Sequence, residues 1–507
     1  MWISVLHPYL FSLYFILFLY AINIQYTPFP STYRVILFHL IAVSILFALF
    51  RLLSKNWYRA ALVTSLVVVL FNSYGHVFKF IGGRQFLGFS PGRADILASV
   101  WISAFILLGW WFIRKLANPK PLTEFITIIA LVLLIFPLIR IGSFLVRGIN
   151  LNPQNDSTSL KYVHNPQRPP DIYYLILDEY GRADVLDEVM SFDNTQLIDY
   201  LKSKGFYVAE DSYANYSVTH LSLRSSLNLD YLPAGTPDYR YSTIRNMQHN
   251  QVRNALEQAG YQFISFASWY SLTELPDADL YIKPQHFINS YEFQYMITSA
   301  LSFGVHLVYF PQSRALITTA FEGLKKIPLI NPATPKFIFA HIPAAHVPFV
   351  YGPERAVAEP YTFPPVPPED EAAGRADYVR GYTGQIVYIN NRVMETIDAI
   401  LEKSNPAPVI IIQGDHGPES LFNWFSFENV CLKERMAILN AYYLPGMDSS
   451  KLYPGISPVN TFRLIFDEYF GTHYGLLEDR SFLTIQDDLT QIKEVTDLVE
   501  TCQLPAP

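Results

Sequence analysis

The chain has 507 residues, of which 50% are hydrophobic and only 16% are charged, a composition that is apolar for a soluble protein. Its net charge of −7 is unevenly distributed, because residues 1–150 contain two acidic and twelve basic residues, whereas residues 151–507 contain 42 acidic and 25 basic ones. This division indicates a membrane-embedded part followed by a water-soluble part, and the acidic second part argues against a nucleic-acid partner, since phosphate contacts need clustered cations.

Five apolar stretches in the first part are each long enough to cross a bilayer as a helix, which takes about 20 residues. They lie at 4–24, 34–54, 60–80, 95–116 and 122–142. The second and fourth loops, at residues 51–59 and 114–120, each carry three basic residues and are therefore expected in the cytoplasm. We expect a multi-pass bundle over residues 1–145 in the cytoplasmic (inner) membrane, with the N-terminus inside and the remainder outside.

Residues 146–169 are predicted to be a linker, because they are largely polar and rich in proline. Residues 170–507 are predicted to form one extracytoplasmic domain. Strands are expected at 172–178, 206–209, 262–267, 336–341, 408–413 and 435–443, and helices at 195–204, 219–230, 249–259 and 375–403. This alternation predicts an α/β domain with a mainly parallel central sheet covered by helices.

Two of the predicted strands end in side chains that ligate metals. Asp178 and Glu179 end the first strand, and Asp415 and His416 follow the strand at 408–413 between two glycines. Adjacent carboxylates repel one another, and a divalent cation is the usual way to keep both ionised, although a helix N-cap is the structural alternative for the first pair. Because parallel strands end at the same edge of a sheet, the two pairs predict one metal site. Oxygen ligands with a histidine suit Mn, Mg or Zn, and the sequence does not choose among them.

A hydroxyl and two imidazoles could complete such a site. Thr219 begins a predicted helix, where backbone N–H groups and the helix dipole stabilise an alkoxide, and a neighbouring metal lowers the hydroxyl pKa further. An ordinary N-cap is the alternative. His341 ends a predicted strand and His346 lies in the loop after it, where imidazoles bind substrate oxyanions or protonate a leaving group. A structural histidine is the alternative for each.

The chain contains only two cysteines, Cys431 and Cys502. One bridge between them is compatible with an oxidising compartment, and two free thiols are the equal alternative. Neither lies in a metal-ligand spacing, so we assign them no catalytic role.

In chain order, these motifs resemble the alkaline phosphatase superfamily, and within it the membrane-anchored sulfatase-like proteins, which include lipoteichoic acid synthases and phosphoethanolamine transferases. The motifs are Asp178-Glu179, Thr219-x-x-Ser222, His341 with His346-x-Pro, and Gly-Asp415-His416-Gly. The resemblance implies an alkaline phosphatase-like fold, with a bundle of about five spans before an extracytoplasmic catalytic domain. It also implies roles for each position: metal ligation by Asp178, Glu179, Thr219, Asp415 and His416, nucleophilic attack by Thr219, and substrate binding by His341 and His346.

The chain departs from two patterns of these relatives. It lacks the Cys-x-Pro-x-Arg motif of formylglycine sulfatases and the multiple cysteines of phosphoethanolamine transferase periplasmic domains. We therefore expect a metal-dependent hydrolase or transferase of phosphate-type esters on an envelope lipid or glycan. The alternatives are a sulfatase acting on sulfate esters and a non-catalytic member that binds the envelope. The sequence does not predict an oligomeric state.

Overall fold

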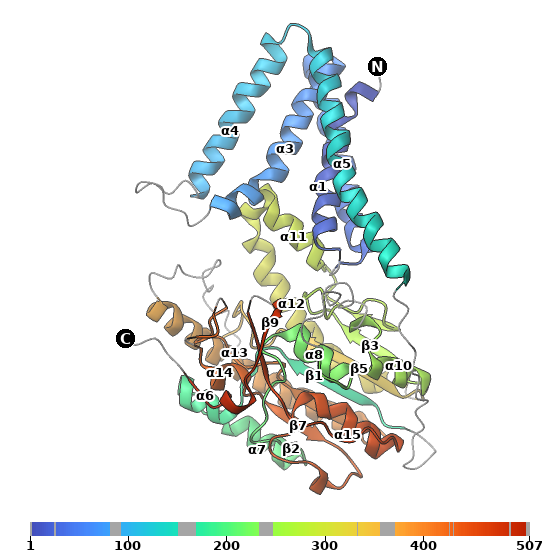
Figure 1. The fold of residues 1–507 in the computed structure, drawn as a ribbon, viewed down its shortest axis with the longest axis vertical. Helices are drawn as coiled ribbons and strands as arrows, with labels where there is room; N and C mark the ends of the chain where they lie inside the picture. Colours follow the sequence, from blue (N-terminus) through green and yellow to red (C-terminus); the bar gives the residue numbers. More distant parts are fainter. Residues whose placement is uncertain are drawn as a thin grey trace. The chain divides into compact units, whose positions relative to one another are not determined.

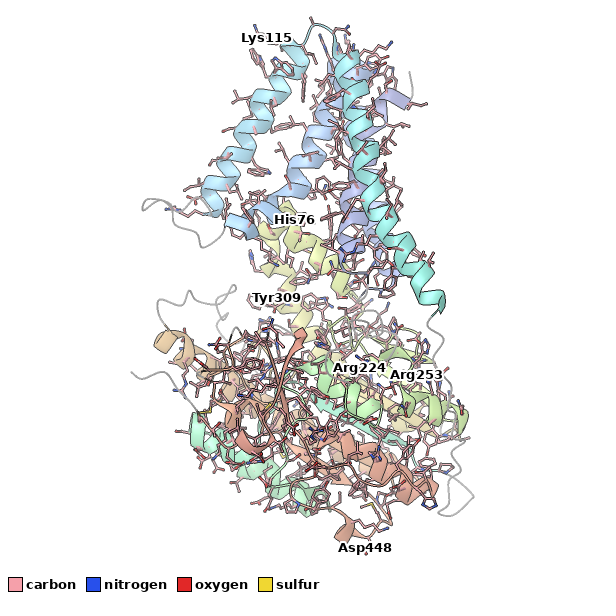
Figure 2. The ribbon with its side chains drawn as sticks, in the orientation of Figure 1. His76, Lys115, Arg224, Arg253, Tyr309 and Asp448 are labelled. Carbon is pink, nitrogen blue, oxygen red and sulfur yellow. A yellow bond between two sulfur atoms is a disulfide. The ribbon has the colours of Figure 1, made fainter. Side chains whose placement is uncertain are left out.

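The structure is a computed structural model that divides into two compact units, Met1–Gln154 with Ile288–Tyr309, and Asn155–Phe287 with Phe310–Pro507. Tyr309, labelled in Figure 2, is the last residue of the first unit. The residues that the structure describes are 3–24, 27–81, 93–150, 169–232, 247–331, 333–354, 371–424, 426–428, 430–485 and 488–502. Most of the predicted linker, residues 151–168, lies outside them, so the predicted domain boundaries stay predictions.

The first unit is built from apolar helices (Figure 1). Its main helices are α1 (His7–Ile22), α2 (Tyr33–Ser54), α3 (Trp57–Ile81), α4 (Ala94–Trp110, continued by a π-helical turn at Trp111–Lys115) and α5 (Pro119–Asn150). Four of them, α2 to α5, are long and apolar enough to cross a membrane. Because α1 has only 16 residues, it is shorter than a typical span, and the predicted fifth crossing is not confirmed.

The first unit also contains α11 (Ser290–Thr298), a 3-10 helix at Ala300–Gly304, and the beginning of α12 (His306–Leu324). A capping box starts α11: the Asn289 side chain accepts a hydrogen bond from the Glu292 backbone N–H, and the Glu292 carboxylate accepts one from the Asn289 N–H. The sequence did not predict that a segment so far along the chain belongs to the helical unit.

The second unit contains a seven-stranded sheet in the order β2-β7-β6-β1-β5-β3-β4. The strands are β1 (Ile172–Leu177), β2 (Tyr207–Val208), β3 (Gln262–Phe266), β4 (Leu280–Ile282), β5 (Lys336–Ile342), β6 (Val409–Gln413) and β7 (Asn440–Tyr443). The five strands from β6 to β4 are parallel, and β7 pairs antiparallel with both β6 and β2. The predicted mainly parallel sheet is confirmed.

Helices cover both faces of this sheet (Figure 1). Alternate β1 residues enter two different cores: Tyr173, Leu175 and Leu177 pack with α6, α7, α12 and α13, and the residues between them pack with α8, α10 and α15. The newly named helices are α6 (Ala183–Met190), α7 (Thr195–Ser203), α8 (Thr219–Leu227), α10 (Gln251–Gln258), α13 (Glu371–Lys403) and α15 (Pro458–Phe470). Burial on both faces explains the uninterrupted apolar sequence of β1.

One predicted strand is only partly correct. Residues 435–443 were expected to be extended throughout, but Leu432–Met436 form the short helix α14 and the strand β7 begins at Asn440. The sequence of α14, Leu-Lys-Glu-Arg-Met, consists of good helix formers, which explains the difference. A small antiparallel pair, β8 (Phe482–Ile485) and β9 (Asp488–Glu494), follows α15.

Cys431 and Cys502 form a disulfide, which decides between the two alternatives that the sequence left open.

Candidate active site

The carboxyl ends of β1, β5 and β6 lie side by side because the three strands are parallel neighbours. Ile176 of β1 is in register with His341 of β5 and with Gln413, the last residue of β6. Asp178, His341 and Asp415 therefore meet as a buried group whose ligand atoms all lie within 4.8 Å of one another. Within this group, His341 Nε2 lies 3.4 Å from Asp178 Oδ2. The sequence predicted that these strand ends would meet, and the geometry adds His341 to the group.

Two glycines allow the chain to pass close to its neighbours after β6. A Cβ at Gly414 would lie 2.4 Å from the Tyr180 carbonyl oxygen, and one at Gly417 would lie 2.0 Å from the Glu434 carbonyl oxygen. Real Cβ atoms do not approach backbone oxygens so closely, so both positions require glycine. The two glycines thus let Asp415 and His416 reach the site from a tightly packed turn.

Thr219 and His416 are the second pair of side chains that the fold brings together. Thr219 is the first residue of α8, and its Oγ1 lies 3.1 Å from His416 Nε2. His416 Nδ1 donates to the Gly417 carbonyl over 3.0 Å, so Nε2 is the acceptor nitrogen of the neutral ring. Burial and the neighbouring Arg435 hold the pKa of His416 well below its ordinary value, which keeps the ring neutral. The Thr219 hydroxyl therefore donates its proton towards His416.

Glu179 lies outside the group of three, although it follows Asp178 directly. Its backbone adopts a left-handed conformation with φ of 65°, which is strained for a residue with a side chain. Its N–H donates to Asp415 Oδ1 over 3.0 Å, and its Oε1 accepts from the Tyr378 hydroxyl of α13 over 2.9 Å. Glu179 thus connects the Asp415 side chain to α13.

His341, near the end of β5, and His346, in the loop after it, differ in their surroundings. Thr273 Oγ1 lies 2.7 Å from His341 Nδ1, which leaves Nε2 facing Asp178. His346 Nδ1 donates to the Val347 carbonyl over 2.7 Å. Burial alone would lower the pKa of His346, but the charges of Asp178, Glu179 and Glu419 raise it to about 9. These carboxylates therefore favour the imidazolium form of His346, which can donate a proton or bind an oxyanion.

Buried carboxylates crowd the site in a way that suits a cation. Burial and the charge of Asp178 raise the pKa of Asp415 to about 6, and burial raises that of Glu179 well above its ordinary value. Asp178 Oδ1, Glu179 Oε2 and Asp415 Oδ2 have no hydrogen-bond partner within the described part of the chain. Buried, unpartnered carboxylate oxygens beside imidazole nitrogens are the ligands of divalent metal ions. The residues present fit such an ion.

Arg435 is a buried cation at the site that the sequence did not reveal. Its Nε donates to the Ser217 carbonyl over 2.8 Å and its Nη1 to the Gly417 carbonyl over 3.1 Å. Nη1 also lies 3.6 Å from Glu179 Oε1. In the sequence, Arg435 is the first residue of the segment 435–443, which is predicted to be a strand, and no local pattern marks it as a site residue.

Comparison with known proteins identifies a family and several solved structures that match parts of the chain. A family model described as Sulfatase matches residues 170–461, more than half of the chain. No curated relative matches. The C-terminal periplasmic domain of EptC from Escherichia coli, solved in complex with Zn, is 15% identical with a TM-score of 0.44, covering 68% of this chain and 95% of its own.

Two further structures are similar over much of their length. The integral membrane lipooligosaccharide phosphoethanolamine transferase EptA from Neisseria meningitidis is 11% identical with a TM-score of 0.40, covering 91% of this chain and 94% of its own. The lipoteichoic acid synthase LtaP from Listeria monocytogenes is 12% identical with a TM-score of 0.38, covering 66% of this chain and 83% of its own.

Proposed function

The chain belongs to the sulfatase family, and from this premise we propose that it is a membrane-anchored, metal-dependent hydrolase or transferase of phosphate-type esters. The observation that carries the proposal is the pairing of Thr219 Oγ1 with His416 Nε2 at 3.1 Å, beside the buried Asp178–His341–Asp415 group. A hydroxyl at the start of a helix, beside a neutral imidazole that can share a metal ion with it, is arranged as a nucleophile.

Each residue of the site has a task in the proposed reaction. Thr219 Oγ1 attacks phosphorus as its proton is lost to solvent, and the ester oxygen leaves with a proton from the His346 imidazolium. The resulting phospho-threonine is then cleaved by water or by an acceptor hydroxyl of a lipid or sugar. The proton of that attacking hydroxyl returns His346 to the imidazolium, and the released Thr219 oxygen regains its proton from solvent.

The proposed ligands of the ion are Asp178, Glu179, Thr219, Asp415 and His416, and the geometry adds His341. When bound, a divalent ion supplies charge stabilisation to the phosphoryl oxygens and lowers the pKa of the adjacent hydroxyl.

The identity of the nucleophile favours phosphate over sulfate esters. Formylglycine sulfatases begin from a Cys or Ser in a Cys-x-Pro-x-Arg motif, which this chain lacks, and it has a threonine at the start of α8 instead. Both cysteines of the chain are joined in the Cys431–Cys502 disulfide and neither is available as a precursor. A threonine oxygen forms a phosphate ester without further modification.

The disulfide also supports a catalytic unit outside the cytoplasm, because such bonds persist in oxidising compartments. The four helices that are long and apolar enough to cross a membrane supply the anchor. Together these features favour a lipid or glycan of the cell envelope as the substrate.

A Thr219→Ala variant tests the nucleophile, with Ser222→Ala as its matched control. Ser222 lies one turn further along α8, and its buried hydroxyl makes no hydrogen bond within the described residues. We expect Thr219→Ala to lower the metal-dependent hydrolysis of bis(4-nitrophenyl) phosphate by at least about 100-fold, roughly 2.7 kcal/mol in the barrier. Ser222→Ala should retain the wild-type rate, and mass spectrometry of quenched wild-type enzyme should detect phosphate on Thr219.

Other outcomes would contradict the proposal. Wild-type activity in Thr219→Ala would exclude this residue as the nucleophile. Turnover of 4-nitrophenyl sulfate in preference to the phosphate diester would favour the sulfatase alternative. A wild-type protein that binds metal but turns over neither ester, nor any envelope extract, would favour the non-catalytic member.

A further inference from the structure

The segment Ile288–Tyr309 is built into the helical unit by specific hydrogen bonds. The Tyr291 hydroxyl of α11 donates to the Ile16 carbonyl of α1 over 2.8 Å, and Asn289 Nδ2 donates to the Ser31 carbonyl over 3.1 Å. Because both partners are backbone oxygens of the helical unit, these contacts fix the position of α11 within it.

Tyr295 joins the same helix to a buried polar cluster. Its hydroxyl donates to Asn72 Oδ1 of α3 over 2.8 Å and also hydrogen-bonds to His39 Nε2 of α2. His39 Nδ1 in turn pairs with Ser12 Oγ of α1 over 2.7 Å. A Cβ at Gly75 of α3 would lie 2.4 Å from the Ile297 carbonyl oxygen, so the two backbones are in direct contact. The segment is therefore an integral part of the bundle.

The 3-10 helix at Ala300–Gly304 lines an open cavity of about 330 Å³ together with α3 and α4. The lining is almost entirely apolar and includes Tyr74, Ala98, Trp101, Ile102, Ala300 and Phe303. The polar atoms of its two amphipathic rings are already used, since the Tyr74 hydroxyl donates to the Ala94 carbonyl and Trp101 Nε1 to the Leu70 carbonyl. The volume lies within the roughly 300–1,000 Å³ typical of small-molecule sites.

The surroundings of the cavity indicate what it holds. Both α3 and α4 are long and apolar enough to cross a membrane. On α4, Ile102, Ile106 and Leu107 are exposed by 59%, 58% and 66%, a surface that is stable only against hydrocarbon. Because the cavity is open and apolar, it faces lipid hydrocarbon wherever α3 and α4 cross a membrane. We propose that this cavity binds one acyl chain of a membrane lipid.

Photolabelling tests the proposal without any need for enzymatic activity. The probe is a phosphatidylcholine with a diazirine on one acyl chain, incorporated at increasing mole fraction into nanodiscs that hold the full-length protein. Irradiation and mass spectrometry then give the labelling of the peptide that contains Ala300 and Phe303. A bound chain gives labelling that saturates, whereas lipid that merely surrounds the protein gives labelling that rises linearly, and a linear rise would overturn the proposal.

A matched pair of substitutions on α4 adds a second test. Ala98 lines the cavity, whereas Ala104 lies on another face of the same helix. We expect Ala98→Trp to fill the cavity and lower labelling of the Ala300–Phe303 peptide about tenfold, while Ala104→Trp leaves it unchanged. Equal labelling in both variants would overturn the assignment. Thermal unfolding and the elution volume of each variant control for folding. If a variant does not fold, the saturation of labelling in the wild type still tests the proposal.

Discussion

Removing the Cys431–Cys502 disulfide should lower the unfolding free energy of the second unit by about 4 kcal/mol. The two cysteines are separated by 71 residues in the sequence. In the chain-entropy description, a cross-link lowers the conformational entropy of the denatured ensemble by about 2.1 + 1.5R ln n cal/mol/K, where n is the number of residues in the closed loop. For a loop of 71 residues this is about 15 cal/mol/K, or about 4.4 kcal/mol at 25 °C.

The perturbation is the double variant Cys431→Ser/Cys502→Ser, and the assay is urea unfolding of the full chain followed by tryptophan emission and by activity. Native contacts beside the bridge remain: the Lys433 N–H donates to the Thr501 carbonyl over 3.1 Å, and its ammonium lies 3.6 Å from Glu500. We therefore expect the variant to keep wild-type activity at 25 °C and to unfold at a lower urea concentration. Reductant added to the wild type should lower its unfolding midpoint to that of the variant, and the same reductant should leave the midpoint of the variant unchanged.

A decrease below about 1 kcal/mol would refute the reasoning, because it would mean that the bridge does not restrict the denatured chain. Activity that falls at 25 °C while the unfolding midpoint stays constant would also refute it. That result would instead show that the bridge acts on the native position of α14, which carries Arg435.

Three further predictions concern the site. Tyr378→Phe removes the donor to Glu179 Oε1 and should weaken metal affinity by about 10- to 100-fold in a competition titration, whereas Tyr388→Phe, a change on the same helix, should not. Gly417→Ala should prevent accumulation of folded protein, because the new Cβ would lie 2.0 Å from a backbone oxygen of α14. In the control Gly384→Ala, the new Cβ meets its nearest atom at 3.5 Å. Thermal unfolding of this control should show a small stabilisation, since alanine is a better helix former than glycine. Chelation should lower the unfolding midpoint of the wild type, since a metal at 100 times its Kd stabilises the folded protein by about 2.7 kcal/mol. Re-addition of Mn, Mg or Zn should restore the midpoint. A midpoint insensitive to chelator would contradict a bound ion.

The sequence was most informative where metal-ligand side chains directly follow an apolar strand. Asp178 and Asp415 stand immediately beyond apolar strands, and the rule that parallel strands end at one edge was sufficient to predict their meeting. The role of His341 in substrate binding stays a prediction, and the structure adds that its Nε2 lies 3.4 Å from Asp178 within the candidate metal group. The register of β5 against β1, which the sequence does not specify, determines how far His341 extends into the site.

Other features depend on contacts between distant elements. Tyr378 and Arg435 reach Glu179 from α13 and α14, which lie about 200 and 250 residues further along the chain. No local pattern distinguishes such a tyrosine from one in an ordinary core. The pairing of Cys431 with Cys502 could also be assigned only from the folded structure, because the presence of two cysteines is compatible with a bridge or with free thiols.

The sequence by itself determined the division into an apolar bundle and an α/β unit, the mainly parallel sheet, and the residue types at the strand ends. It could do so because hydrophobic periodicity and composition are properties of short stretches of chain. Only the tertiary structure decided that Ile288–Tyr309 joins the helical unit, that Thr219 meets His416, and that the 3-10 helix at Ala300–Gly304 lines one cavity with α3 and α4. These depend on the packing of segments far apart in sequence, where shape and hydrogen-bond partners, rather than local propensity, select the arrangement.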